Sequence, residues 1–275
     1  MKSYKSNRKL WIIFIIYLII NVFLVVIHEP WRDEIHSWLM AKNYGLFELI
    51  RESRFDGHPI LWQLILMPVA KLNAPIITLN IISLIFVSIA TWLFLFKTKL
   101  PTILKIISTF SVPFTYTFSS ISRNYALVIL LMIIIGVTYD KRQQKPILYS
   151  IIISLLIHSH VLAWGLVAGL TITFHFDEII NFFKKKNTVS IRKIMIGLTI
   201  IVINTILVVL ELYGVPNPNY ITGKSLIMLL SLIIIFFTLL IALIITINKK
   251  SCIREYIILA CGLLFQAIIY IFVYS

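Results

Sequence analysis

The sequence predicts an all-α membrane protein, a multi-pass transmembrane bundle of about nine spans with interfacial helices in its first external loop. Three observations predict this class. Hydrophobic residues make up 60% of the 275 residues, they occur in long uninterrupted runs, and basic residues gather at the ends of those runs. A soluble protein is excluded, because one core could not bury so much apolar surface.

Seven apolar runs approach the length of a transmembrane helix, about 17 to 25 residues with some allowance for broken helices. They are Leu10 to Ile27, Ile76 to Phe96, Leu100 to Tyr116, Ala126 to Tyr139, Ile194 to Leu212, Ser225 to Ile247 and Tyr256 to Tyr274. The first run follows four basic residues and has no small-residue cleavage site, so we expect a retained span and not a cleaved signal peptide.

The stretch Ile147 to Phe174 has two interpretations, one long tilted span or a hairpin of two short helices that breaks at His158-Ser159-His160. The hairpin puts 18 of the 25 Lys and Arg residues on the cytoplasmic side, whereas the single span puts only 11 there. Because cytoplasmic loops are enriched in basic residues, the hairpin is favoured. The predicted N-terminus is cytoplasmic, and the loop of residues 28–75 is extracytoplasmic.

The charge and cysteine content exclude two further classes. The net charge of +14 comes from residues that end apolar runs, and they form no basic face with interleaved aromatics, so no nucleic-acid partner is predicted. Cys252 lies in a predicted cytoplasmic turn and Cys261 inside an apolar run, which leaves no disulfide framework and no CxxC metal site.

The first external loop holds most of the chemistry. Six of the 11 acidic residues and three of the six histidines lie between positions 28 and 59. They are Glu29, Asp33, Glu34, Glu48, Glu52 and Asp56, with His28, His36 and His58. A simple connection between two helices would need no such set.

The segment Trp31 to Trp38 follows the first span directly. Pro30 and Asp33 can open a short helix whose membrane side carries Ile35, Trp38 and Leu39, so that Asp33 faces outward. The structural alternative is that Asp33 and Glu34 cap this helix and pair with Arg32.

The loop continues with Asp56-Gly57-His58-Pro59, where a turn explains Gly57 and Pro59 but not the two titratable side chains. The following segment, Ile60 to Ala70, is apolar but too short to cross a bilayer. It is predicted to lie in the outer interface, a depth that suits Trp62.

Two polar sites lie beyond the loop. Arg123, in Ser122-Arg123-Asn124-Tyr125 at the outer end of a predicted span, either snorkels or binds an anion such as a lipid phosphate or a loop carboxylate. His158-Ser159-His160 is expected to be a turn exposed to water. The first loop has residue types that suit a divalent metal, but no ligand signature such as HExxH, so no metal site is predicted and a metal stays an alternative.

An Asp-Glu pair in the first external loop, a Gly-His-Pro entry to an apolar helix about twenty residues later, and an Arg-x-Tyr before a span together resemble the GT-C superfamily of membrane glycosyltransferases. That group includes protein O-mannosyltransferases and lipid A aminoarabinose transferases. The resemblance covers residues 10–175, and it implies a single membrane domain over residues 1–275. Members of the family usually have more spans and often a C-terminal soluble domain, so we expect a compact, truncated or partner-dependent member.

The resemblance implies inverting transfer of a sugar from a polyprenyl-phosphate carrier to an acceptor hydroxyl, with no cofactor. The acceptor would be a glycan, lipid or protein, and the site would face outward from a membrane, here the bacterial inner membrane. The catalytic candidates are Asp33, as base, and Glu34. The donor-side and phosphate-side candidates are Arg123, His58, Tyr125 and Arg32, and the candidate sugar or acceptor contacts are Trp31, His36, Asp56 and His160. A flippase or polymerase of lipid-linked glycans, or a non-catalytic membrane subunit, is the alternative.

Overall fold

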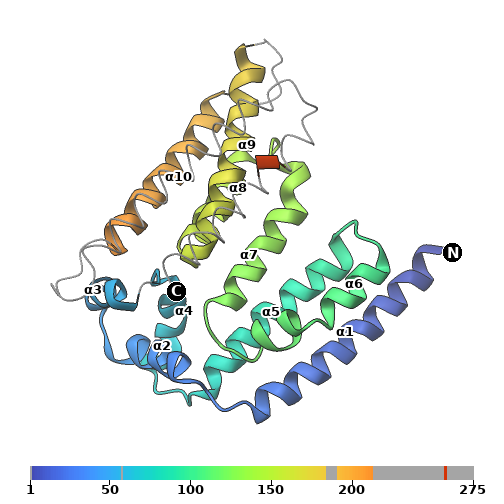
Figure 1. Ribbon diagram of the computed structural model, residues 1–275, viewed down its shortest axis with the longest axis vertical. Coiled ribbons are helices and arrows are strands. Elements are labelled where there is room, and N and C mark those ends of the chain that lie inside the picture. The colour runs from blue at the N-terminus through green and yellow to red at the C-terminus, as the bar shows by residue number, and fades with distance from the viewer. Residues whose placement is uncertain (1, 57, 184–190, 213–256, 259–275) are drawn as a thin grey trace. The chain divides into compact units, whose positions relative to one another are not determined.

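The structure is a computed structural model that describes residues 2–56, 58–183, 191–212 and 257–258 (Figure 1). Every regular element in these residues is helical. The predicted spans 225–247 and 256–274 and the basic cluster 249–254 lie almost wholly outside the described residues. The chain divides into two compact units, Met1–Arg51 with Ile60–Tyr139, and Glu52–Pro59 with Asp140–Ser275, which are described separately.

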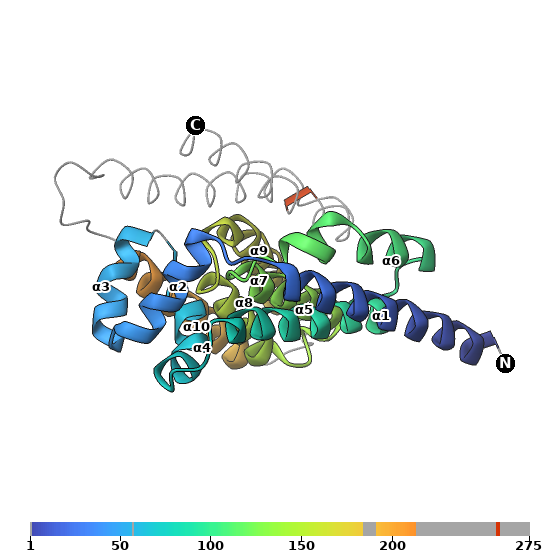
Figure 2. The ribbon, with the colours of Figure 1, turned by 90° about the horizontal axis from the view of Figure 1, so that it is seen from below.

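The first unit contains two long apolar helices, α1 (Lys2–Ile27) and α5 (Ile77–Lys97), which run side by side (Figure 2). Helix α7 (Tyr125–Thr138) packs on α5. The core between them contains Tyr17, Val87, Phe114 and Ala126, one residue from each of four segments. The Tyr17 hydroxyl donates a hydrogen bond to the Phe114 carbonyl at 2.9 Å, which satisfies both polar groups inside the apolar core.

Three short helices connect α1 to α5: α2 (Arg32–Asn43), α3 (Leu46–Asp56) and α4 (Leu61–Lys71). Met40, Leu49 and Ile60 form a small buried cluster among them. Helix α4 exists as predicted, but Trp62 is 2% exposed and packs edge-on against Phe86, so this side chain is a core residue within the protein.

The segment Leu100 to Tyr116 differs from the single span that its hydropathy predicts. It consists of α6 (Thr102–Thr109) and a π-helical turn, η1 (Pro113–Thr117), which are too short to form one crossing helix. Pro113 cannot donate the backbone hydrogen bond that would continue α6, so the ladder ends before it. The buried Lys105 ammonium donates to the carbonyls of Leu95 and Thr98 and thereby caps the end of α5.

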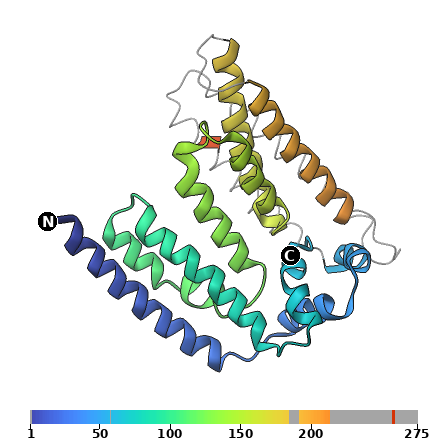
Figure 3. The same cartoon turned by 180° about the vertical axis from the view of Figure 1, so that it is seen from behind.

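The second unit contains α8 (Pro146–Ile157), α9 (Trp164–Phe183) and α10 (Ile191–Leu212), which lie together in Figure 3. The single-span interpretation of 147–174 is wrong, because α8 ends at Ile157 and the chain turns through 158–160 before α9. The Ser159 hydroxyl and the Trp164 indole donate to the last carbonyls of α8, at 2.7 and 3.1 Å.

In the part of the chain that the structure describes, three helices are long and apolar enough to cross a membrane: Arg8–Ile27, Ile77–Lys97 and Arg192–Leu212. They match three of the predicted spans. Helices α4 and α8 and the first part of α9, to His175, are apolar but shorter.

Candidate active site

The candidate site in the first unit begins with the fold of α2. Trp31 is the residue before the helix, and its backbone N–H donates to Glu34 Oε2 at 2.7 Å, which is the glutamate half of a capping box because the Trp31 indole accepts no hydrogen bond. The alternative in which Asp33 and Glu34 both cap this helix is therefore correct for Glu34, whereas Asp33 does not cap it. Of the residues expected on the membrane side, Ile35 and Leu39 are exposed, but Trp38 is 4% exposed and packs inside the protein.

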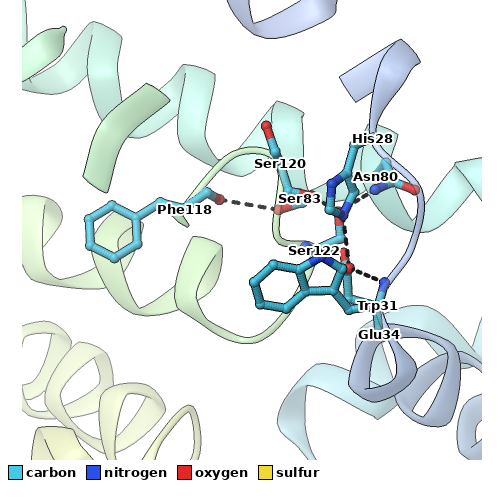
Figure 4. Close-up of polar contacts among 8 residues, drawn as sticks. All are labelled: His28, Trp31, Glu34, Asn80, Ser83, Phe118, Ser120 and Ser122. Atoms are coloured by element: carbon cyan, nitrogen blue, oxygen red, sulfur yellow. Dashed lines mark hydrogen bonds and ion pairs between the residues drawn. The ribbon is translucent and has the colours of Figure 1, made fainter. Parts of the chain in front are cut away.

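Glu34 does more than cap, because its carboxylate is fully buried and joins three segments. Oε2 also lies 2.9 Å from His28 Nε2, at the end of the first span, and Oε1 accepts the Ser122 backbone N–H at 2.5 Å (Figure 4). A buried carboxylate is costly unless such donors compensate for its lost hydration. The His28 contact becomes an ion pair when the imidazole is protonated.

The loop that carries Ser122 is also fastened to α5 (Figure 4). The Asn80 amide donates to Ser122 Oγ at 2.8 Å, and the Ser83 hydroxyl donates to the Phe118 carbonyl at 3.3 Å. Asn80, Ser83 and Ser122 are all fully buried. This loop therefore has fixed anchors on two sides, Glu34 and α5.

Asp33 precedes Glu34 and Arg123 follows Ser122 in the sequence, and these two side chains form an ion pair. Arg123 donates from a terminal guanidinium nitrogen to Asp33 Oδ2 at 2.7 Å. The Asp33 side chain is 60% exposed, and that of Arg123 is 15% exposed. A lipid phosphate and a loop carboxylate were the two anions expected for Arg123, and the structure shows the carboxylate of Asp33. The expected pairing of Asp33 with Arg32 is wrong, because Asp33 pairs with Arg123. Tyr125 joins them, with its ring centre 6.0 Å from the Arg123 guanidinium carbon.

The other first-unit candidates lie at the surface of α2. Trp31 is 52% exposed, and Arg32 and His36 are exposed as well.

The remaining candidates lie together in the second unit. The rings of His58 and His160 are 4.8 Å apart between centroids, and Asp56 ends α3 two residues before His58. The turn 158–160 was expected to be exposed, but Ser159 is fully buried and His160 is 4% exposed. Within the described residues, no three His, Cys, Asp or Glu side chains are grouped as metal ligands.

Sequence reasoning did not assign a role to His28, Ser122 or Asn80 at this site. The capping box is local, and a Glu three residues after Trp31 is its signal. The link from Glu34 to Ser122 crosses 88 residues of sequence, and no spacing rule reports it.

Comparison with known proteins adds no assignment. No protein-family model matches this chain, and no curated protein or solved structure matches it either.

Proposed function

We propose that this chain is an inverting membrane glycosyltransferase that takes a sugar from a polyprenyl-phosphate carrier on the extracytoplasmic face and transfers it to an acceptor hydroxyl. The observation that supports this most is the exposed Asp33 carboxylate beside a fixed guanidinium. The proposal also rests on the sequence resemblance to the GT-C superfamily and on a topology of about nine spans with a cytoplasmic N-terminus.

The proposed reaction is a single displacement at the anomeric carbon. Asp33 accepts the proton of the acceptor hydroxyl while its oxygen forms the new bond to the anomeric carbon. The bond from that carbon to the carrier phosphate oxygen breaks, and its electron pair leaves on the lipid phosphate. Arg123 stabilises the charge of the departing phosphate. A guanidinium has five N–H donors, so one bond to Asp33 leaves others for a phosphate.

Inversion is favoured because a retaining enzyme needs a second carboxylate as nucleophile, about 5 Å from the first. Glu34 is buried and engaged by three donors, so it is poorly suited to attack a sugar. Trp31 offers an exposed ring on which a sugar can stack. Arg32 and His58 remain proposed for the donor side, and His36, Asp56 and His160 remain proposed contacts of the sugar or acceptor.

The test is a transfer assay in proteoliposomes that contain a polyprenyl-phosphate sugar. We expect Asp33→Asn to abolish turnover while carrier binding survives, because Asn cannot accept the proton. The matched control is Asp140→Asn, the same change at an exposed residue that is not a site candidate, which should transfer at the parent rate. Undiminished turnover in Asp33→Asn would remove Asp33 from the catalytic role.

The same assay separates the alternative functions. A flippase would move the carrier across the bilayer with no transfer, and its transport would not depend on the Asp33 carboxylate. A non-catalytic subunit would show neither activity alone and would gain transfer only with a second protein.

A further inference from the structure

Glu34 and Asp33 are neighbours in α2, and each accepts a hydrogen bond from the same distant loop, at Ser122 and Arg123 respectively. Glu34 accepts from the Ser122 backbone, and Asp33 accepts from the Arg123 side chain. The Asp33–Arg123 pair is largely exposed on the Asp33 side, and an exposed ion pair alone fixes geometry weakly. The Glu34–Ser122 bond is fully buried, so it is the stronger of the two constraints.

The carboxylate of Glu34 is buried, and both of its oxygens accept hydrogen bonds in this anchoring. One oxygen accepts from His28 and from the Trp31 N–H, and the other accepts from Ser122. Its exposed fraction is zero. Because the carboxylate has no exposed surface, an acceptor hydroxyl could reach it only if one of the segments that cover it moved.

We infer that Glu34 is a positioning residue, a buried latch that holds the loop of Ser122 against α2 so that Arg123 is placed on Asp33. This role rests on the proposed function, because it assigns Glu34 to the geometry of that site and not to contact with the acceptor. His28 and Asn80 support the latch from the ends of α1 and α5, through Glu34 and Ser122 respectively.

The chain offers a matched control for this role in Glu48. Its Oε2 accepts the Gly45 N–H at 2.8 Å, the same three-residue capping bond that Glu34 makes with Trp31. Glu48 is exposed, however, whereas Glu34 also binds a loop 88 residues away. Glu48→Gln therefore tests the loss of a cap alone, and Glu34→Gln tests the loss of a cap and of the latch.

Ser122 permits a second variant that removes the latch without changing Glu34. The Arg123 N–H donates to the Ile121 carbonyl at 2.9 Å, a three-residue turn centred on Ser122. Ser122 has a negative φ, since Asn73 is the one non-glycine residue with positive φ in the described chain. This inverse γ-turn has a central φ near −75°, which proline accepts. Ser122→Pro thus deletes the N–H and keeps the turn, and Ser122→Ala controls for the hydroxyl.

The first experiment measures position and needs no activity. In the full chain with Cys252→Ser and Cys261→Ser, Asp33→Cys and Arg123→Cys are joined with a short-spacer bismaleimide in proteoliposomes. Adding Glu34→Gln or Ser122→Pro should slow cross-linking about tenfold, which corresponds to about 1.4 kcal/mol in the free energy of bringing the two thiols within reach of the reagent. Glu48→Gln and Ser122→Ala should cross-link at close to the parent rate. An unchanged rate in Glu34→Gln would overturn the latch, whether or not the protein transfers sugar.

The second experiment separates a latch from an acceptor contact. If Glu34 acts through Ser122, then Glu34→Gln and Ser122→Pro should each lower kcat about a hundredfold with donor KM nearly unchanged. The double variant should be no slower than the slower single one, because both changes break the same bond. Multiplied effects would place Glu34 on the substrate and overturn the inference.

Folding is monitored by size-exclusion chromatography in detergent. If one latch variant does not fold, the other variant carries the test. If neither folds while Glu48→Gln does, Glu34 holds the whole unit together, and the specific positioning role is overturned.

Discussion

At the residue scale, Glu34 and Glu48 show how burial changes the role of one side chain. Each accepts the backbone N–H three residues earlier, at 2.7 and 2.8 Å. The exposed Glu48 contributes a helix cap and little else, because water competes for its carboxylate. The buried Glu34 has no access to water and therefore must collect donors from other segments.

His158 gives a prediction at the same scale. This imidazole ends α8 and lies 3.0 Å from the Asn204 amide oxygen. Burial lowers the pKa of His158 below 6.5, and the Asn204 contact opposes this in part. The unfolded chain therefore binds this proton more readily than the folded one, so this contribution to stability is complete above pH 6.5 and is lost as pH falls through the folded pKa.

The measurement is the thermal unfolding of purified protein in detergent over this pH range. The parent should lose stability on acidification, and His158→Gln should lose less over the same interval. Parallel curves for the two proteins would show that protonation of His158 is not coupled to unfolding.

At the element scale, α8 and α10 pack closely because Gly197 has no side chain. A Cβ at Gly197 would lie 2.5 Å from Ser150 Oγ and 3.3 Å from Ser150 Cβ. Both distances are below van der Waals contact, so the Ser150 hydroxyl would have to rotate and the two helices would have to separate by a few tenths of an ångström. Small residues permit this kind of approach between helices in membranes.

We predict that Gly197→Ala lowers the melting temperature. The substitution gains up to about 1 kcal/mol of helix propensity but loses about 1 to 3 kcal/mol to overpacking. Gly136→Ala is the matched control, since a Cβ there meets nothing within 4 Å and only the propensity gain applies. Adding Ser150→Ala to Gly197→Ala should recover part of the loss. Equal melting temperatures in the two alanine variants would contradict the close packing.

The same scale shows what the sequence could predict. The break at residues 158–160 was predictable, because polar residues interrupt an apolar run there. The hairpin also places more Lys and Arg on the cytoplasmic side than a single span does. The division of Leu100 to Tyr116 was missed because the prediction rested on hydropathy, which reports apolar content and gives no weight to the missing backbone N–H of Pro113. The motif made Asp33 a candidate site residue, which stays a prediction, but the pairing of Asp33 with Arg123 depends on a tertiary contact across 90 residues.

At the scale of the whole molecule, the described helices include three that can cross a membrane, and the proposed topology supplies the rest. In the proposed topology, which rests on the distribution of Lys and Arg, the loop that carries Asp33 lies outside and the segment around Gln144 lies inside. The proposed reaction requires that arrangement, because the carrier sugar is presented on the outer face.

Cysteine labelling in intact cells tests this topology. In the chain with Cys252→Ser and Cys261→Ser, Asn43→Cys should react with a membrane-impermeant maleimide, and Gln144→Cys should react only after the cells are opened. Both positions are exposed on the protein, so reactivity reports the side of the membrane. The reverse pattern would place the Asp33 loop in the cytoplasm and rule out an extracytoplasmic transfer.

The 88-residue separation between Glu34 and Ser122 also concerns the synthesis of this protein. At about 5 to 20 residues per second, a ribosome needs roughly 4 to 18 s to proceed from one residue to the other. During that interval Glu34 has left the ribosome without its Ser122 partner, and α5 must be inserted before the bond can form. A nascent chain arrested before residue 122 should therefore hold an unfinished first loop, which offers insertion factors or a quality-control protease a period in which to act.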